Sequence, residues 1–254
     1  MKKIVYNTLL LLLVLTTGGL KAQNHQYVVD SAEYVVQRYL KLLNIDNGFP
    51  ADSVLYIESY IYSTSNPHDT IVMKRWQALP LCERIELWHN DTLQIGYISN
   101  TKDFYRYYNT ERHEWAPIAP EGYYIQSDGY HFQGSLYYWK TDGSELEYTG
   151  IWHFNNHEVY RILVKRVDKY DRYCMFEKES GLLFLIDEQA KKTNEMIHVK
   201  ENDLKWRAFH EFVPVGRMLL PSQESYQADN KIVLIFHNYQ FLPGDKKYFN
   251  QEER

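Results

Sequence analysis

Apolar and polar side chains alternate with a period of two over long stretches of this 254-residue chain. In residues 55–62 the apolar Leu55 and Ile57 alternate with tyrosine and glutamate, and residues 81–88 and 93–97 repeat the pattern. Successive side chains of a strand point to opposite faces of a sheet, so this period predicts half-buried β-strands. Short polar turns separate the strands, which favours antiparallel pairing.

The alternation returns in the C-terminal half, where turn-forming residues mark hairpins. Asn155-Asn156 accepts the positive φ of a tight turn, and Glu179-Ser180-Gly181 marks a second turn. The strands predicted here are residues 151–154, 159–164, 173–176, 182–186, 206–213, 217–220 and 232–236. With about four strands before them, they predict a mainly antiparallel β protein.

Two segments have the spacing of helices. In residues 31–43 apolar side chains recur on one helical face, Ser31 can cap the first turn, and residues 47–50 end the helix. Residues 116–120 contain two prolines and are expected to lie outside any sheet. After them, residues 128–141 predict a second, helical insertion with one broad apolar side.

The N-terminus reads as a signal peptide covering residues 1–22. Lys2 and Lys3 precede an apolar run at residues 8–15, and Ala22 is a small residue at the expected cleavage point. The run is too short to span a bilayer, which needs about 20 apolar residues, so a retained anchor is the less favoured alternative. No cysteine lies near the cleavage point, so we expect an exported protein without a lipid anchor, made of one domain at residues 23–254.

The formal charge argues against two classes of partner. It is −5 for the whole chain, and removing Lys2, Lys3 and Lys21 with the signal peptide makes it −8. Nucleic-acid binding requires cations that neutralise phosphates, and simple attachment to anionic head groups requires them as well. We therefore expect neither nucleic acid nor an anionic membrane surface as partner.

Few residues suggest catalysis or metal binding. His153 and His157 are four apart but flank a predicted turn, and Glu145-Leu146-Glu147 places two carboxylates on one solvated strand face. Cys82 and Cys174 could form a disulfide in an oxidising location or stay separate buried thiols. We predict no catalytic residue, no metal site and no cofactor.

An aromatic group leaves a further alternative open. The chain holds 23 Tyr and 6 Trp, and residues 104–108 with Trp115 could stack against a sugar. Aromatic residues also favour the half-buried surface of a sheet, and we prefer that interpretation here.

Several C-terminal segments resemble the periplasmic lipoprotein-carrier family, the LolA-like half-barrels. Residues 160–164 followed by 173–177, with the turn Ser180-Gly181-Leu182, are similar to the family's paired strands and turn. Residues 212–221 resemble its strand, glycine turn and proline, and residues 232–241 resemble its closing strand.

The resemblance implies an unclosed, strongly curved antiparallel β half-barrel, with an N-terminal helix and a helical insertion in the concave face. It implies a periplasmic monomer that carries a lipid or a lipoprotein acyl chain, and a membrane-bound donor or acceptor protein as a further partner. Burial of each methylene group contributes about 0.8 kcal/mol, so an acyl chain can bind an apolar cavity without polar contacts. The residues expected to line this cavity are Leu55, Ile57, Ile85, Ile95, Phe132, Leu136, Tyr137, Trp139, Ile162, Val164 and Leu234.

Two other functions stay open at this stage. An extracytoplasmic module that binds a protein or a glycan without lipid cargo would use tyrosine and tryptophan patches. A hydrolase would need a convergent polar cluster in a cleft, and no motif in the sequence indicates one.

The signal peptide gives the first testable prediction. N-terminal sequencing of protein purified from its native host should begin at Gln23, because cleavage after Ala22 removes the apolar run. An Ala22→Asp variant, with a charged residue at the cleavage point, should keep its leader. Soluble intracellular protein that still begins with Met1 would contradict export.

Overall fold

The computed structural model describes residues 31–79, 82–101, 104–117, 132, 136–154, 156–166, 171–187, 206–228 and 231–249. The predicted signal peptide lies outside these residues. Among the residues described, no helix combines the length and the apolar character that a membrane crossing requires.

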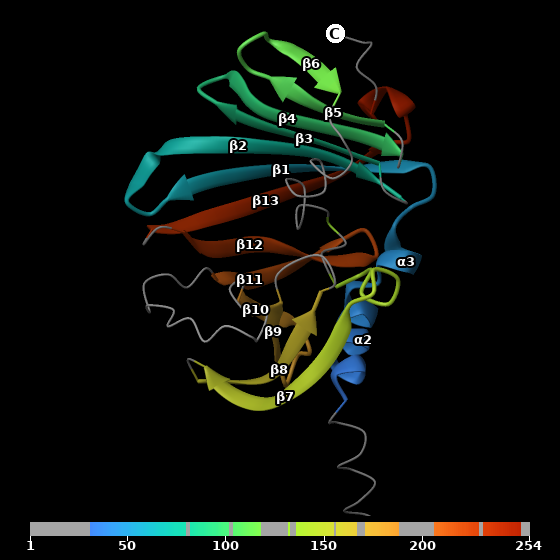
Figure 1. Cartoon of the computed structure of the whole chain (residues 1–254), viewed down its shortest axis with the longest axis vertical. Helices are drawn as coiled ribbons and strands as arrows, with labels where there is room; N and C mark the ends of the chain where they lie inside the picture. Colours follow the sequence, from blue (N-terminus) through green and yellow to red (C-terminus); the bar gives the residue numbers. More distant parts are fainter. Residues whose placement is uncertain are drawn as a thin grey trace, which may run out of the picture.

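Thirteen strands form one sheet (Figure 1). The first six are β1 (Ser53–Ser63), β2 (Asn66–Ala78), β3 (Cys82–His89), β4 (Thr92–Thr101), β5 (Phe104–Asn109) and β6 (Glu114–Pro117). The other seven are β7 (Glu145–Phe154), β8 (His157–Lys165), β9 (Arg172–Glu177), β10 (Leu183–Asp187), β11 (Trp206–Val215), β12 (Met218–Ala228) and β13 (Lys231–Pro243). The remaining elements are α2 (Ala32–Leu43), α3 (Ile45–Gly48) and the 3-10 helix η2 (Lys246–Phe249).

The sheet is antiparallel and does not close. Its order is β6-β5-β4-β3-β2-β1-β13-β12-β11-β10-β9-β8-β7, so each half consists of strands paired with their sequence neighbours. The two halves join where β1 pairs with β13, from Ser53 opposite Pro243 to Ser63 opposite Val233. The expected unclosed, curved antiparallel half-barrel with an N-terminal helix is confirmed (Figure 1).

Helix α2 forms where the sequence predicts it. The Ser31 side chain accepts a hydrogen bond from the Tyr34 amide, and Asn44 ends the helix in the left-handed conformation at φ 52°. Its apolar side, with Val35, Val36 and other residues, packs into the main core. A short second helix, α3, follows at once.

Polar contacts fix α2 to two turns of the sheet. The Arg38 guanidinium donates to the carbonyls of Lys178 and Glu179 in the β9–β10 turn, at 3.0 and 2.7 Å. At the helix end, Asn44 donates to the carbonyl of Arg217 in the β11–β12 turn, at 2.8 Å. The helix is therefore held to the C-terminal half of the sheet at both positions.

The predicted helical insertion is wrong in the part that the structure describes. Residues 136–143 form successive turns, with the Asp142 amide donating to the Tyr138 carbonyl at 2.9 Å. Leu136 is buried in the main core, so packing decides the local conformation more than helical periodicity does. Of the rest of the predicted helix, only Phe132 belongs to the described residues.

The sheet also extends beyond the predicted strands. Pro117 belongs to β6, although residues 116–120 were expected outside the sheet. β6 is an edge strand, where a residue without a backbone N–H can be accommodated. The strand β2 was not predicted either, because it begins with polar residues and a proline rather than with an alternating pattern.

Two adjacent leucines of α2 test how much the helix contributes to stability. Leu43 is 2% exposed in the core, whereas Leu42 is 38% exposed. Leu43→Ala should lower the free energy of unfolding by about 2–5 kcal/mol, and Leu42→Ala by less than about 0.5 kcal/mol. Denaturant unfolding of both variants measures the difference, and equal losses would contradict this packing of α2.

Candidate functional site

The two faces of the sheet have different surroundings. We call the face that packs against α2 the inner face; it carries Leu55, Ile57, Ile162 and Phe176, all in one cluster with Val36 of the helix. The opposite face is the outer face. Because side chains alternate along each strand, the register assigns every strand residue to one of the two.

Most of the residues expected to line a cavity pack against one another on the inner side. Leu55, Ile57, Leu136, Ile162 and Val164 are buried in the main core. Three more expected residues, Phe132, Tyr137 and Trp139, are partly buried against the same cluster. In this structure these side chains belong to one core cluster, which also includes residues of α2.

Three expected residues lie outside this core cluster, two of them still on the inner face. Ile85 is buried on the inner face opposite Arg75 of β2, and Ile95 is 43% exposed on the same face. Leu234 belongs to the outer face, because it lies an odd number of residues before His237, which points inward. Residues 232–236 are nearly all apolar, so the sequence alone does not show which alternate positions point inward.

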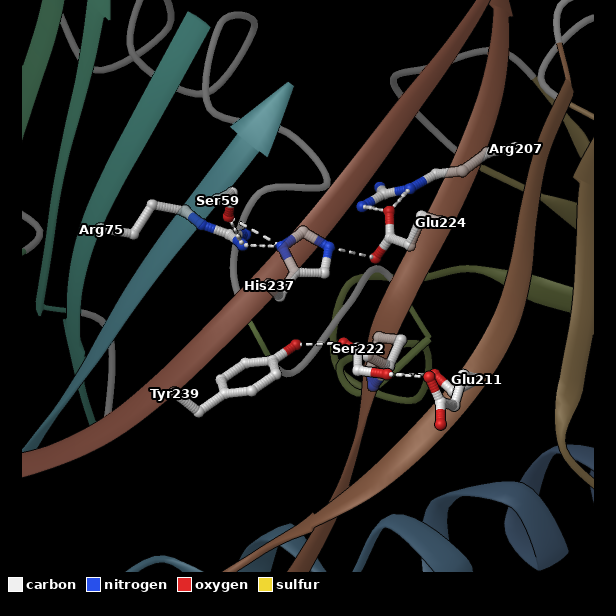
Figure 2. A network of polar contacts seen from close by, with 9 residues as sticks. Ser59, Arg75, Arg207, Glu211, Ser222, Glu224, His237 and Tyr239 are labelled. Atoms are coloured by element: carbon white, nitrogen blue, oxygen red, sulfur yellow. Dashed lines mark hydrogen bonds and ion pairs between the residues drawn. The ribbon is translucent and has the colours of Figure 1, made fainter. Parts of the chain in front are cut away.

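A buried ionic network crosses the inner face beside this core (Figure 2). Arg207 of β11 donates to the Glu224 carboxylate of β12 through Nε and Nη2, at 2.6 and 2.5 Å. Nε2 of His237 on β13 lies 3.2 Å from the other carboxylate oxygen. Glu224 is 3% exposed and His237 is 6% exposed, so these charged and polar groups lie in the protein interior.

The network continues onto β1 and β2. Ser59 Oγ lies 2.7 Å from Nδ1 of His237, and Nη2 of Arg75 lies 3.1 Å from Ser59 Oγ and 3.3 Å from the same Nδ1. A guanidinium can only donate, so Nδ1 accepts and the ring proton belongs on Nε2, facing Glu224. The contacts thus assign one tautomer to a neutral His237.

Burial and neighbouring charges shift the pKa values of this network. Burial alone would raise the pKa of Glu224, but Arg207 and then His237 outweigh it and hold the pKa at about 2. Burial lowers the pKa of His237, and the two arginines lower it further against the opposing effect of Glu224. Glu224 is therefore ionised and His237 neutral at neutral pH.

Further polar residues extend the network toward β4. Gln77 of β2 donates to Glu83 of β3, and Ser99 of β4 lies opposite Glu83. The Phe132 amide donates to Gln77 at 2.9 Å, which places this one residue against the inner face. We call the whole set the polar stripe: Ser59, Arg75, Gln77, Glu83, Ser99, Arg207, Glu224 and His237.

Beyond the polar stripe lies an apolar area that is only partly covered. Ile71 is 37% exposed and Ile95 is 43% exposed. The register places Ile61 between Ile71 and Ile235, and Leu87 next to Ile95. We call this set the inner-face apolar patch: Ile61, Ile71, Leu87, Ile95, Val233 and Ile235.

The weaker catalytic and metal candidates stay apart from this region. His157 pairs with Glu177 at 2.9 Å, and His153 is exposed at the β7–β8 hairpin. Both cysteines are free thiols, and burial raises the pKa of Cys174 to about 12, which keeps it protonated. Within the described ranges, no three His, Cys, Asp or Glu side chains gather as a metal site would require.

Trp115 and Tyr108 of the aromatic group pack together on the outer face, whereas Tyr107 lies opposite Tyr97 on the inner face. Gly96 lets the Trp115 ring lie close to β4, because a Cβ there would sit 2.5 Å from the ring. The Arg84 guanidinium lies 5.3 Å from the Trp76 ring and 5.6 Å from the Trp115 ring, and donates to the buried Glu86. This arrangement agrees with strand packing, the preferred interpretation of these aromatic residues.

Comparison with known proteins identifies the fold. No protein-family model matches the sequence, and no curated protein matches it. A LolA superfamily protein from Nitrosomonas europaea is similar in structure, with a TM-score of 0.56 and 8% sequence identity over 87% of this chain and 98% of that chain. A DUF1329 family protein from Desulfovibrio piger has a TM-score of 0.56 and 12% identity over 88% of this chain and 98% of that chain. An outer membrane lipoprotein-sorting protein domain from Vibrio parahaemolyticus has a TM-score of 0.54 and 13% identity over 87% of this chain and 98% of that chain. The chain has a LolA-like fold.

The lowered pKa of His237 predicts a pH dependence of stability. The unfolded chain binds a proton at this residue near pH 6.5 while the folded protein does not, so the free energy of unfolding should fall below about pH 6.5. His237→Gln should flatten this dependence between about pH 7.5 and 5. The control is His153→Gln, since that side chain is 75% exposed, and its profile should match the wild type.

Proposed function

We propose that this protein is an extracytoplasmic carrier or binding protein for a hydrophobic ligand held on the inner face of the sheet. The observation that carries the proposal is the half-exposed inner-face apolar patch in an unclosed LolA-like sheet. One of the similar structures is described as a lipoprotein-sorting domain, which supports lipid or lipoprotein acyl chains as the cargo.

The inner-face apolar patch has the properties that an acyl chain requires. Its side chains come from five neighbouring strands; Met73 on the same face lies opposite Leu87 and connects Ile71 with Leu87 and Ile95, while His89 lies opposite Ile71. Burying apolar area stabilises a complex by about 25 cal/mol for each Å². An acyl chain over Ile71 and Ile95 would therefore gain affinity without any specific polar contact.

The core cluster limits where this ligand can bind. Leu55, Ile57 and Ile162 are buried in the same cluster as residues of α2, which Arg38 and Asn44 fix to the sheet. In this proposal the ligand first contacts Ile95 and its neighbours, and the buried residues form the wall of the core behind the polar stripe.

The setting follows from the same proposal. The signal-like N-terminus supports a periplasmic location after cleavage, and a carrier of lipid would exchange its cargo with a membrane-bound donor or acceptor protein. We infer that residues 23–254 make one domain, since all thirteen strands described belong to one sheet.

A protein- or glycan-binding module is the second candidate, and one observation favours it. Trp152 and Phe154 are 47% and 39% exposed on the outer face, near the end of the edge strand β7. Contiguous exposed apolar side chains can mark a contact with a partner. A partner bound there would leave the inner face free.

Two exposed isoleucines provide a matched test of the proposal. Ile95 on the inner face and Ile232 on the outer face are both 43% exposed. Ile95→Asp should weaken binding of the neutral fluorescent probe N-phenyl-1-naphthylamine, because a charge in the patch opposes apolar contact, while Ile232→Asp should not. Both variants should keep the wild-type free energy of unfolding within about 0.5 kcal/mol.

Mass spectrometry of an organic extract of the purified protein should in addition detect bound lipid. A wild-type protein that contains no lipid and does not bind the probe would rule out the carrier function. Equal loss of probe binding in both variants would place the ligand elsewhere.

A further inference from the structure

A cleft lies at the junction of α2 and α3, apart from the inner-face apolar patch. The turns at residues 136–143 lie beside these helices (Figure 1), and the cleft between them has a volume of about 580 Å³. Small-molecule sites have volumes of roughly 300–1,000 Å³, so a ligand of the size of a disaccharide has room here. None of the described residues that line the cleft belongs to the patch or to the polar stripe.

The junction of the two helices supplies the polar side chains of the cleft. Asn44 adopts the left-handed conformation that ends α2, and α3 begins with the next residue. Ile45 is 2% exposed and fixes α3 in the main core, while Asp46 and Asn47 are exposed and line the cleft. Lys41, in the last turn of α2, lines it as well. Residues 41–47 therefore bring both charged groups and amides to one opening.

Several polar atoms of the cleft are available to a ligand. Among the described residues, the Lys41 ammonium and the Asn47 side-chain amide have no hydrogen-bond or ion-pair partner. The Asp46 carboxylate accepts from the Tyr137 hydroxyl through Oδ1, which leaves Oδ2 to accept from a ligand. Asn44 donates through its amide nitrogen to the β11–β12 turn, so its carbonyl oxygen can still accept. The cleft thus offers both donors and acceptors.

Two tyrosine rings form another wall of the cleft. The centroids of Tyr137 and Tyr138 are 4.9 Å apart and the ring planes meet at 81°, so the rings make a corner. The hydrogen bond from Tyr137 to Asp46 fixes this corner to α3. The face of an aromatic ring carries partial negative charge, which favours packing against the C–H groups of a saturated ring.

We propose that this cleft binds a neutral saccharide. Each sugar hydroxyl donates one hydrogen bond and can accept two, so neighbouring hydroxyls can donate to Asp46 and accept from Lys41 and Asn47. The C–H face of the same sugar ring packs on Tyr138. The opposite charges of Lys41 and Asp46 cancel, so the cleft does not favour an ionised ligand over a neutral one.

Saturation-transfer NMR on the purified protein tests this inference. Cellobiose, maltose and N,N′-diacetylchitobiose are each compared with N-acetyl-trialanine amide, a neutral peptide of similar size. At least one disaccharide should receive saturation from the protein, and the peptide should not. Transfer to none of the disaccharides, or to the peptide alone, would overturn the saccharide assignment.

Two substitutions assign the binding to the cleft. Tyr138→Ala should weaken the affinity for the bound disaccharide about 3- to 10-fold, because it removes the stacking surface. Asp46→Asn should weaken it about 5- to 10-fold, since a neutral amide oxygen is a weaker acceptor but still accepts from Tyr137.

Matched controls lie far from the cleft. Tyr60 is 37% exposed on the outer face of β1, and Asp91 is exposed in the β3–β4 turn. Tyr60→Ala and Asp91→Asn should leave the affinity unchanged. Equal losses in the cleft variants and the controls would overturn the site.

A measurement on the wild type covers the case in which Tyr138→Ala does not fold. In protein labelled with nitrogen-15, the side-chain amide signal of Asn47 should shift as the disaccharide is added, whereas that of Asn90 in the β3–β4 turn should not. A bound disaccharide that leaves the Asn47 signal unchanged would overturn the inference.

The saccharide site and the proposed carrier function can fail separately. Asp46→Asn should not change binding of N-phenyl-1-naphthylamine, because Asp46 does not belong to the inner-face apolar patch. Probe binding without any saccharide binding would therefore overturn this inference and leave the carrier function standing.

Discussion

The ionised Glu224 carboxylate, buried between Arg207 and His237, is the constraint on which the inner face depends. Removing a charge from water costs several kcal/mol, and only partners with good geometry offset that cost. The partners come from β11, β13, β1 and β2, so the network requires five adjacent strands to keep one register. A shift of one residue would turn these groups to the outer face and leave charges without partners.

Much of the architecture could be predicted from local sequence pattern. The period-two alternation at residues 55–62 and the hairpin in which Phe154 pairs with His157 follow from strand geometry and turn chemistry, and both occur as predicted. Helix α2 was predictable because its cap and its apolar face are encoded within twelve residues. β2 was missed since its first residues are polar, and the turns at residues 136–143 depend on where Leu136 packs rather than on neighbouring residues.

The candidate site was less predictable, because its members are distant in sequence. Arg75 and His237 are separated by 162 positions, and nothing in either segment indicates that they meet. The one local signal was Ser59 at an otherwise apolar position between Ile57 and Ile61. Apolar residues such as Leu55 were expected to line a cavity. The sequence pattern can place them in the interior of the protein, but only the three-dimensional packing shows that they share a core cluster with α2.

The pairing of β1 with β13 affects how the chain can be made and delivered. The strand that joins the two half-sheets spans Lys231–Pro243, so it is synthesised after the other twelve strands described. Until it arrives, β1 and β12 both expose an unpaired edge, and the polar stripe cannot assemble without His237. Pairing between such distant segments is slow to form. If the chain is exported as we propose, this order keeps the two half-sheets unjoined, and the chain hence able to cross a membrane, until β13 has been synthesised.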